Sequence, residues 1–376
     1  MTLAGTALVA LFVVLFAALV LGALIVGGRT VRRAREAGRA RLAGPARRLL
    51  LAIAAGDDDP RQIEELVRLP DEVWLAVEPS AVALLGKVRG EAHTTLVDVF
   101  ERRGAAWRAR SQLKRRDPVA RAMAAEVLGN LRRRDAVLPL CDLLSDPDPD
   151  VRVVAARSLG RIGDAGATQP LLATLRSRRP VPAHVVATAL TRLGTPAQGA
   201  LTAALDDPRS PVRATAAEVL GLIGAAGATV RVESALRADP AVEVRVSAAR
   251  TLGRLGTRTA LAPLLDALGE DRPAVLRAEA ARALGELGAV TAAPALTALL
   301  ADADYAVAHN AARSLLRLGS AGRAALVAAE HRAHVRPRHS AEPDEGPGPE
   351  VLLGAAHARE ALAAAELDDR RRQAVP

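Results

Sequence analysis

Hydrophobic residues recur at a fixed interval over residues 117–326. Each interval of 30 to 32 residues contains a leucine, with an alanine three residues before it and a leucine or isoleucine three residues after it. Positions three residues apart share one face of an α-helix, so each interval predicts a helix with an apolar face. The seven marker leucines are Leu128, Leu159, Leu190, Leu220, Leu252, Leu284 and Leu315. A period of this length is typical of a solenoid, in which stacking buries faces that a single repeat would leave exposed.

Glycines and prolines divide each repeat into two helices. A glycine lies four residues after six of the marker leucines, where a left-handed conformation can end the first helix. Prolines then fall in the first turn of a second helix, where the missing amide donor costs little. We therefore predict an all-α fold, an α-solenoid of about seven helix pairs. A further glycine directly follows the marker in five repeats, although a glycine inside a helix costs about 1 kcal/mol relative to alanine. Its recurrence predicts close packing of neighbouring helices.

The turns between repeats carry a second regularity. In four repeats an aspartate precedes an arginine by six residues: Asp146 and Arg152, Asp207 and Arg213, Asp239 and Arg245, Asp271 and Arg277. An aspartate at such a turn can accept hydrogen bonds from backbone amides at a helix start and from an arginine of a stacked helix. We interpret these residues as a structural ladder, not as groups for acid–base chemistry.

Two of the repeats, DPDPDVRVVAARSLGRIGDAGATQPLLATL and DPAVEVRVSAARTLGRLGTRTALAPLLDAL, resemble HEAT repeats in the short form associated with phycobilisome lyases. The resemblance covers residues 117–326 and implies an α-solenoid that binds other proteins on its curved surface. A minority of the family handles bilins or damaged DNA. The third repeat departs from the pattern, because SRRPVPAHVVATALTRLGT lacks both the aspartate–arginine pair and the glycine after Leu190.

The N-terminus predicts a membrane anchor. Residues 3–28 form a run of 26 residues without a charge, which as a helix would span ~39 Å and exceed the ~30 Å core of a bilayer. The segment 29–48 then carries eight arginines against one glutamate. By the positive-inside rule we expect residues 1–28 to be a single transmembrane helix with its N-terminus outside, and the rest to be cytoplasmic. Contact of 29–48 with anionic lipid is expected as well. A cleaved signal peptide is the alternative, but no basic residue precedes the apolar run.

Three further segments flank the repeats. Residues 49–116 predict several helices that cap the exposed first repeat. Residues 327–349 are polar and rich in proline and glycine, which is typical of a disordered linker. Residues 350–376 predict an alanine-rich C-terminal helix and tail.

Composition and motifs argue against several classes of function. The net charge is +9, but much of the excess lies in 29–48, and aromatic residues make up only 2% of the chain, too few for a base-stacking groove. We therefore expect no nucleic-acid partner. The single cysteine, Cys141, excludes a disulfide within the chain and a cysteine-based zinc site. Because no catalytic or cofactor-binding motif is present, we expect no cofactor, no metal and no enzymatic activity.

These features favour a single-pass, membrane-anchored scaffold or adaptor that binds a protein partner, such as a membrane-bound enzyme. The alternative is a lyase-like accessory protein that handles a chromophore or a small ligand. We expect the second helix of each repeat to line the concave surface, and the turn of the third repeat to form a notch. The candidate partner-binding residues are Asp142, Arg176, Arg178, Arg179, Arg237 and Asp266.

Overall fold

The computed structural model describes residues 21–22, 44–57, 59–332 and 348–373, and the regular elements among them are all helical. The prediction of an all-α solenoid is confirmed. The chain divides into two compact units, residues 1–131 and 132–376. The division falls after the helix of the first marker, Leu128, and not at residue 116, so that helix belongs to the N-terminal unit.

The N-terminal unit has its own apolar core. Besides a helical segment over residues 44–54, its helices are α2 (Pro60–Val67), α3 (Asp71–Leu85), α4 (Glu91–Arg102), α5 (Ala105–Gln112) and α6 (Pro118–Asn130). Trp74 and Phe100 are fully buried and meet edge to face, with ring centroids 5.2 Å apart. Aromatic pairs of this geometry add to the stability that burial provides. The two largest buried side chains of the unit therefore join α3 to α4.

Arg103 joins three segments of this unit. Its guanidinium donates hydrogen bonds to the carbonyl oxygens of Val67 at 2.7 Å and Leu69 at 2.9 Å, and to the carboxylate of Asp71 at 3.0 Å. It also lies over the Trp74 ring, 4.7 Å from the centroid. The carbonyls at the end of α2 have no partner within that helix, so Arg103 supplies the donors they lack. Burial lowers the pKa of its guanidinium.

The second unit contains the stacked repeats. Its α-helices are α7 (Val137–Asp142), α8 (Pro149–Ile162), α9 (Thr168–Thr174), α10 (Ala183–Leu193), α11 (Gln198–Ala203), α12 (Ser210–Leu222), α13 (Thr229–Ala238), α14 (Val242–Leu255), α15 (Leu261–Asp266), α16 (Ala274–Leu287), α17 (Ala293–Ala298), α18 (Tyr305–Arg317), α19 (Ser320–Arg332) and α20 (Pro349–Gln373). Short 3-10 turns, for example Leu143–Ser145, extend several of them. All six marker leucines of this unit are fully buried.

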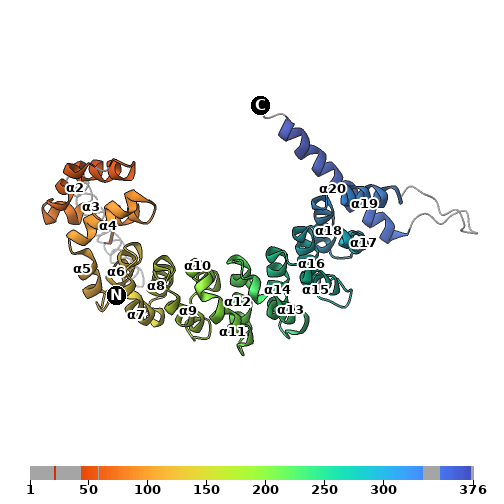
Figure 1. Ribbon diagram of the computed structural model, residues 1–376, viewed down its shortest axis with the longest axis horizontal. Helices are drawn as coiled ribbons and strands as arrows, with labels where there is room; N and C mark the ends of the chain where they lie inside the picture. Colours follow the sequence, from red (N-terminus) through yellow and green to blue (C-terminus); the bar gives the residue numbers. More distant parts are fainter. Residues whose placement is uncertain (1–20, 23–43, 58, 333–347, 374–376) are drawn as a thin grey trace, which may run out of the picture. The chain divides into compact units, whose positions relative to one another are not determined.

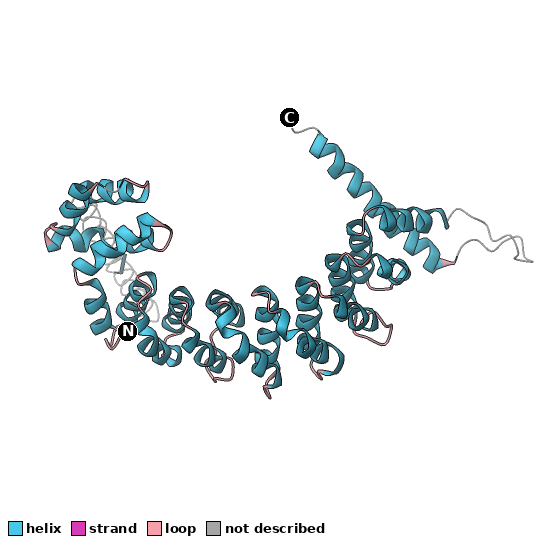
Figure 2. Ribbon diagram, in the orientation of Figure 1, coloured by secondary structure: helices cyan, strands magenta, loops and turns pink. Residues whose placement is uncertain are grey.

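The repeats of this unit stack into two layers (Figures 1 and 2). Helices α8, α10, α12, α14, α16 and α18 form an inner row on the concave side of the curve, and α7, α9, α11, α13, α15 and α17 form an outer row on its convex side. The expectation that the second helix of each repeat lines the concave surface is therefore corrected. The helices that carry the marker leucines line it instead.

The glycine after the marker leucine lies at a close contact between neighbouring inner helices. This contact accounts for the recurrence of the glycine and for the curvature of the stack. A Cβ added to Gly160 would lie 2.8 Å from Cα of Ala189, and one added to Gly253 would lie 2.8 Å from Cα of Ala283. Gly285 faces Ser314 in the same way. Real Cβ atoms do not approach so closely, so only glycine allows these inner helices to pack at this distance. Close approach along the inner row, without the same approach in the outer row, bends the repeats toward the inner side.

Left-handed glycines end the inner helices as predicted. Gly163, Gly256 and Gly288 have φ values of 74°, 66° and 66°. In the first repeat the equivalent position is Arg132, whose φ of 52° is the only positive value among the described residues that are not glycine. A non-glycine residue in this region is strained by about 1–2 kcal/mol, so the backbone geometry is kept even where the glycine is missing.

The C-terminal helices close the second unit. Helix α19 continues to Arg332, into the predicted linker, because Leu326 and Ala329 pack inward. Helix α20 packs against α18 and α19 and buries Ala355, Ala358 and Ala361. The remaining residues assigned to the linker, 333–347, lie outside the described part of the chain.

The expected membrane localisation is contradicted. Among the described residues no helix is long and apolar enough to cross a membrane. The longest described helix, α20, has 25 residues but ends in a strongly charged segment. Of the predicted transmembrane segment 3–28, only Leu21 and Gly22 are described, and residues 29–43 of the basic segment also lie outside the described part.

Candidate protein-binding surface

The predicted ladder joins neighbouring repeats, with a different pairing from the one expected. Arg213 donates to the carbonyl oxygen of Asp207, six residues earlier, at 2.8 Å, but its two hydrogen bonds to a carboxylate go to Asp239 in the next turn. Arg277 likewise binds the carboxylate of Asp302 through Nε at 2.9 Å and Nη2 at 2.8 Å. Each arginine therefore closes its own turn and clamps the turn that follows. The sequence pattern missed Asp302, because no arginine follows it by six residues.

The ladder aspartates also hold the backbone of their turns. Asp146 accepts a hydrogen bond from the amide of Asp148 at 2.9 Å, and Asp239 accepts one from Ala241 at 2.9 Å. Burial of the Asp239 carboxyl raises its pKa, but the hydrogen bonds from Arg213 and Ala241 outweigh burial and leave the pKa lowered. The carboxylate therefore stays charged, as a structural ion pair requires.

Arg152, Arg245 and Asp271 depart from this scheme. Arg152 is buried and donates to the carbonyl oxygens of Asp146 and Pro147, but its Nε has no hydrogen-bond partner within the described chain. The turn that follows it, before α10, contains no aspartate. The Nε of Arg245 also lacks a partner among the described residues, because Asp271 turns outward and pairs with Arg272 at 3.5 Å.

Arg176 repairs the ladder at the irregular third repeat. The inner helix α10 has Ala183 where its neighbours α8 and α12 have an arginine. Arg176, in the turn after the outer helix α9, instead donates through Nε to Asp207 at 2.7 Å, and this carboxylate is 3% exposed. A second bond runs from Arg209 to the carbonyl oxygen of Arg176 at 2.7 Å. Arg176, predicted as a partner-binding residue, is therefore engaged in a structural ion pair.

The other candidate residues are exposed but scattered. Asp142, Arg237 and Asp266 lie on the outer helices α7, α13 and α15, and Arg178 and Arg179 lie in the turn between α9 and α10. The structure does not bring them together into one surface. Cys141, beside Asp142, is half-buried, and burial, with the nearby Asp142 and Asp164, raises the pKa of its thiol to about 11. It is therefore protonated at neutral pH and a poor nucleophile.

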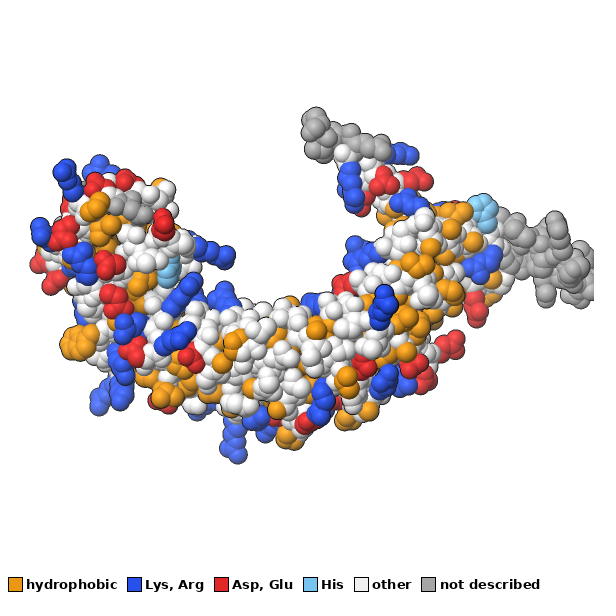
Figure 3. Space-filling view, viewed as in Figure 1, with side chains coloured by type: hydrophobic (Ala, Val, Ile, Leu, Met, Phe, Trp, Pro, Cys, Tyr) orange, Lys and Arg blue, Asp and Glu red, His pale blue; other side chains and the backbone are white. Residues whose placement is uncertain are grey.

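The inner row carries a regular set of charged side chains that the sequence analysis did not single out. On these helices, the residues two positions before and two positions after the marker leucine point away from the buried marker. Four arginines at such positions are exposed and form no ion pair within the described chain: Arg157 on α8, Arg192 on α10, Arg254 on α14 and Arg313 on α18. Basic side chains are spaced along this inner edge in Figure 3. The signal that could have found them is the same period that revealed the markers.

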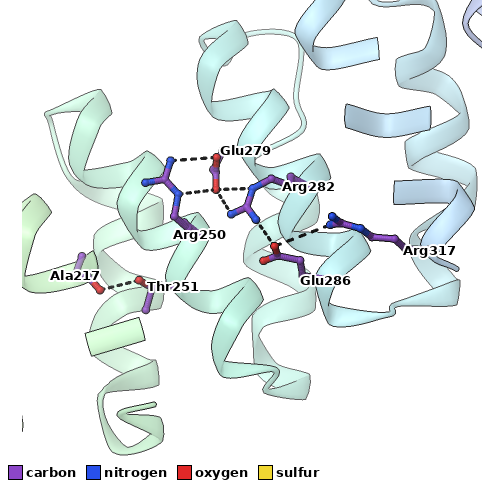
Figure 4. A network of polar contacts seen from close by, with 7 residues as sticks. All are labelled: Ala217, Arg250, Thr251, Glu279, Arg282, Glu286 and Arg317. Carbon is purple, nitrogen blue, oxygen red and sulfur yellow. Dashed lines mark hydrogen bonds and ion pairs between the residues drawn. The ribbon is translucent and has the colours of Figure 1, made fainter. Parts of the chain in front are cut away.

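Other inner-row arginines are neutralised by a network across three helices (Figure 4). Glu279 accepts hydrogen bonds from Arg250 of α14 and from Arg282 of its own helix α16. Arg282 also pairs with Glu286, which lies 3.9 Å from Arg317 of α18. Burial of Glu279 raises its pKa, but the two arginines outweigh burial and lower it overall. This network stiffens the C-terminal end of the inner row and leaves the unpaired arginines as the groups available to a partner.

A groove interrupts the inner row between α10 and α12. It has a volume of about 440 Å³ and is lined by Ala183, His184, Ala187, Thr188, Thr191 and Arg192 of α10 and by Glu218 and Leu222 of α12. Leu222 is 44% exposed. The irregular third repeat therefore does form a notch, although it opens on the inner face of α10 and not at Arg178 and Arg179.

A second cavity, of about 480 Å³, lies at the C-terminal end of the array, between α18 and α20. There Asp368, Asp369 and Arg372 of α20 line the cavity together with Arg313 of the inner row. Tyr305 donates a hydrogen bond to Glu360 of α20 at 3.2 Å. The last inner helix is thus covered in part by an alanine-rich helix of the same chain.

Comparison with known proteins identifies the repeat. The sequence profile of HEAT repeats matches residues 108–190, 229–317 and 270–334, which together make up just over half of the chain. No curated protein matches the chain in sequence. Among solved structures it is similar to an engineered protein, with 21% identity and a TM-score of 0.36 over 89% of this chain and 95% of the other.

Two further solved structures are similar at comparable levels. The complex of CpcE and CpcF of phycocyanin lyase from Nostoc sp. has 23% identity and a TM-score of 0.32 over 68% of this chain and 94% of the other. Human deoxyhypusine hydroxylase in complex with glycerol has 21% identity and a TM-score of 0.30 over 69% of this chain and 96% of the other. Such distant likenesses support no statement about activity. The profile match, the regular period and the stacked helix pairs together show that the chain belongs to the HEAT-repeat family.

Proposed function

We propose that this chain is a non-enzymatic scaffold that binds a protein partner along the inner row of its repeats. HEAT repeats generally mediate protein interactions, and an extended concave surface is the usual binding surface of a solenoid. The observation that carries the proposal is the set of exposed arginines on α8, α10, α14 and α18 that form no ion pair within the described chain. Arginine is enriched at protein interfaces because its guanidinium binds carboxylates in a bidentate manner.

A protein fits this surface better than a nucleic acid. Glu218 lies among the arginines of the inner helices and would repel a phosphate backbone. No aromatic side chain lies on the inner helices α8 to α16 to stack on a base. We do not extend the proposal to a lyase-like protein that handles a chromophore, because the unpaired arginines are spread over four helices and only Arg192 lines the groove.

The proposal is tested by charge reversal on the two sides of the array. Arg157→Glu combined with Arg254→Glu changes the inner row, and Arg178→Glu combined with Arg237→Glu makes the same change of charge at exposed positions away from it. We expect partners that co-purify with the wild-type chain after nuclease treatment to be lost from the inner-row variant and kept by the control. Equal retention by both variants, with unchanged thermal unfolding, would contradict binding along the inner row. Loss caused by the nuclease alone would favour nucleic acid.

A further inference from the structure

The groove between α10 and α12 exists because two side chains replace the close glycine contact found at the neighbouring junctions. Thr191 occupies the position that is Gly160 in α8 and Gly253 in α14. Opposite it, α12 presents Val219 where other repeats have the smaller Ala189 or Ser314. Both replacements add atoms at the point where the helices would otherwise meet, so α10 and α12 stand further apart. The contact between them is the smallest between consecutive helices of the inner row.

The walls of the groove differ in chemistry. Its apolar part consists of Ala183, Ala187 and the partly exposed Leu222. Arg192 lies on the α10 side and Glu218 on the α12 side. A volume of about 440 Å³ is within the ~300–1,000 Å³ range of ligand sites. Because Glu218 would repel a carboxylate, the α12 side favours an uncharged, apolar side chain next to Leu222.

The helices on either side favour acidic residues. Arg157 of α8 precedes the groove, Arg192 lies at its rim and Arg254 of α14 follows it, and none of the three has an acidic partner in the described chain. A segment bound along the row would therefore place acidic side chains on α8, α10 and α14 and an apolar side chain on α12.

Helix spacing converts this order into a sequence pattern. Packed helices lie ~8–10 Å apart, and a segment in the extended polyproline II conformation advances ~3.1 Å per residue with three residues per turn. Every third side chain of such a segment faces the inner row, about once per inner helix. We infer that the inner row binds an extended acidic segment of a partner protein, with the pattern Glu-x-x-Glu-x-x-Leu-x-x-Glu or its reverse, whose apolar side chain enters the groove between α10 and α12. This inference rests on the proposed function and specifies its partner.

The test uses the full chain and two synthetic peptides, one for each direction of the pattern. Fluorescence anisotropy should show saturable binding of at least one peptide. The Leu222→Asp variant should bind it at least about 10-fold more weakly, a loss of about 1.4 kcal/mol. Replacement of the peptide's leucine by serine should have a similar effect. Leu138 of α7 is an exposed leucine of the outer row, at 78% exposure, so Leu138→Asp is the matched control and should bind as the wild type does.

Several outcomes would overturn the inference. They are the absence of binding by both peptides, equal binding by wild type and Leu222→Asp, or tighter binding of a single-stranded DNA oligonucleotide than of either peptide. The inference and the proposed function fail separately. If charge reversal at Arg157 and Arg254 removes the co-purifying partner but Leu222→Asp does not, the inner row binds a partner and the groove does not receive its side chain.

Discussion

Arg213 holds both carboxylate oxygens of Asp239, through Nε at 2.7 Å and Nη2 at 2.8 Å, across the boundary between two repeats. Their side chains are only 12% and 7% exposed, so the pair is largely shielded from solvent. Bidentate pairs of this kind are among the strongest hydrogen bonds in proteins. Because the stability of a solenoid depends on contacts between neighbouring repeats, this pair contributes to the coupling on which the array depends.

Removal of Arg213 should therefore weaken the array. We expect Arg213→Ala to lower the free energy of unfolding by about 2–3 kcal/mol, since a charged hydrogen-bonded group is lost and Asp239 is left buried without its partner. Arg245→Ala is the matched control, because Arg245 is the ladder arginine whose Nε has no partner among the described residues. Its effect should be about 1 kcal/mol or less. Denaturant unfolding followed by circular dichroism measures both variants, and equal losses would show that the carboxylate pairing contributes little.

The same pair predicts a dependence of stability on pH. The folded pKa of Asp239 is lowered, so its contribution is fully present above the unfolded pKa and is lost as the pH falls through the folded value. Asp207 and Glu279 act in the same direction. We expect the melting temperature to fall on acidification below about pH 4. Asp239→Asn should be less stable than wild type at neutral pH and should lose less of its remaining stability in acid. A parallel decline of both proteins would contradict this assignment.

The inner-row glycines should not tolerate a methyl group. Alanine favours a helix over glycine by about 1 kcal/mol, but at Gly253 the new Cβ would lie 2.8 Å from Cα of Ala283. We expect the clash to outweigh the helix preference, so that Gly253→Ala destabilises the array by about 1–3 kcal/mol. Gly199→Ala in α11 is the control, since no atom lies within 4 Å of its added Cβ. Its thermal unfolding should be unchanged or occur at a higher temperature. A stabilised Gly253→Ala would show that the helices can separate without loss.

The repeat period of the buried residues could be predicted from the sequence, but the partners of the ladder arginines could not. The period and the two helices per repeat were predictable because buried positions such as Leu159 must recur at the same place in every stacked unit. The pairing of Arg213 with the Asp239 carboxylate could not be predicted. The regular spacing in the sequence links Arg213 to Asp207 of its own turn, whereas its distance to Asp239 depends on how the repeats stack. At the third repeat Ala183 stands in the ladder position, and Arg176, from the turn after α9, pairs with Asp207 instead, which leaves no periodic signal. Which row of helices lies on the concave side depends on how closely the helices of each layer pack, and the hydrophobic period carries no information about that distance.

The N-terminal unit should depend on Arg103. Arg103→Ala removes the hydrogen bonds to the carbonyls of Val67 and Leu69 and the contact with the Trp74 ring. We expect a loss of about 2–4 kcal/mol, detected as a shift in Trp74 fluorescence at lower denaturant concentration. Arg103→Lys should recover only part of the loss, because an ammonium lacks the planar fork of donors. Full recovery by lysine would show that charge alone suffices.

The junction between α10 and α12 has a mechanical consequence. A stack of repeats behaves as a spring whose joints bend in proportion to how weakly each is held, and this joint lacks both the glycine contact and the inner-helix arginine of its neighbours. The array therefore bends most easily at Thr191, where the hydrogen bond between Arg176 and Asp207 connects the neighbouring repeats. A ligand bound there acts on the weakest joint, and a given force opens this joint further than it opens a stiffer joint of the same row.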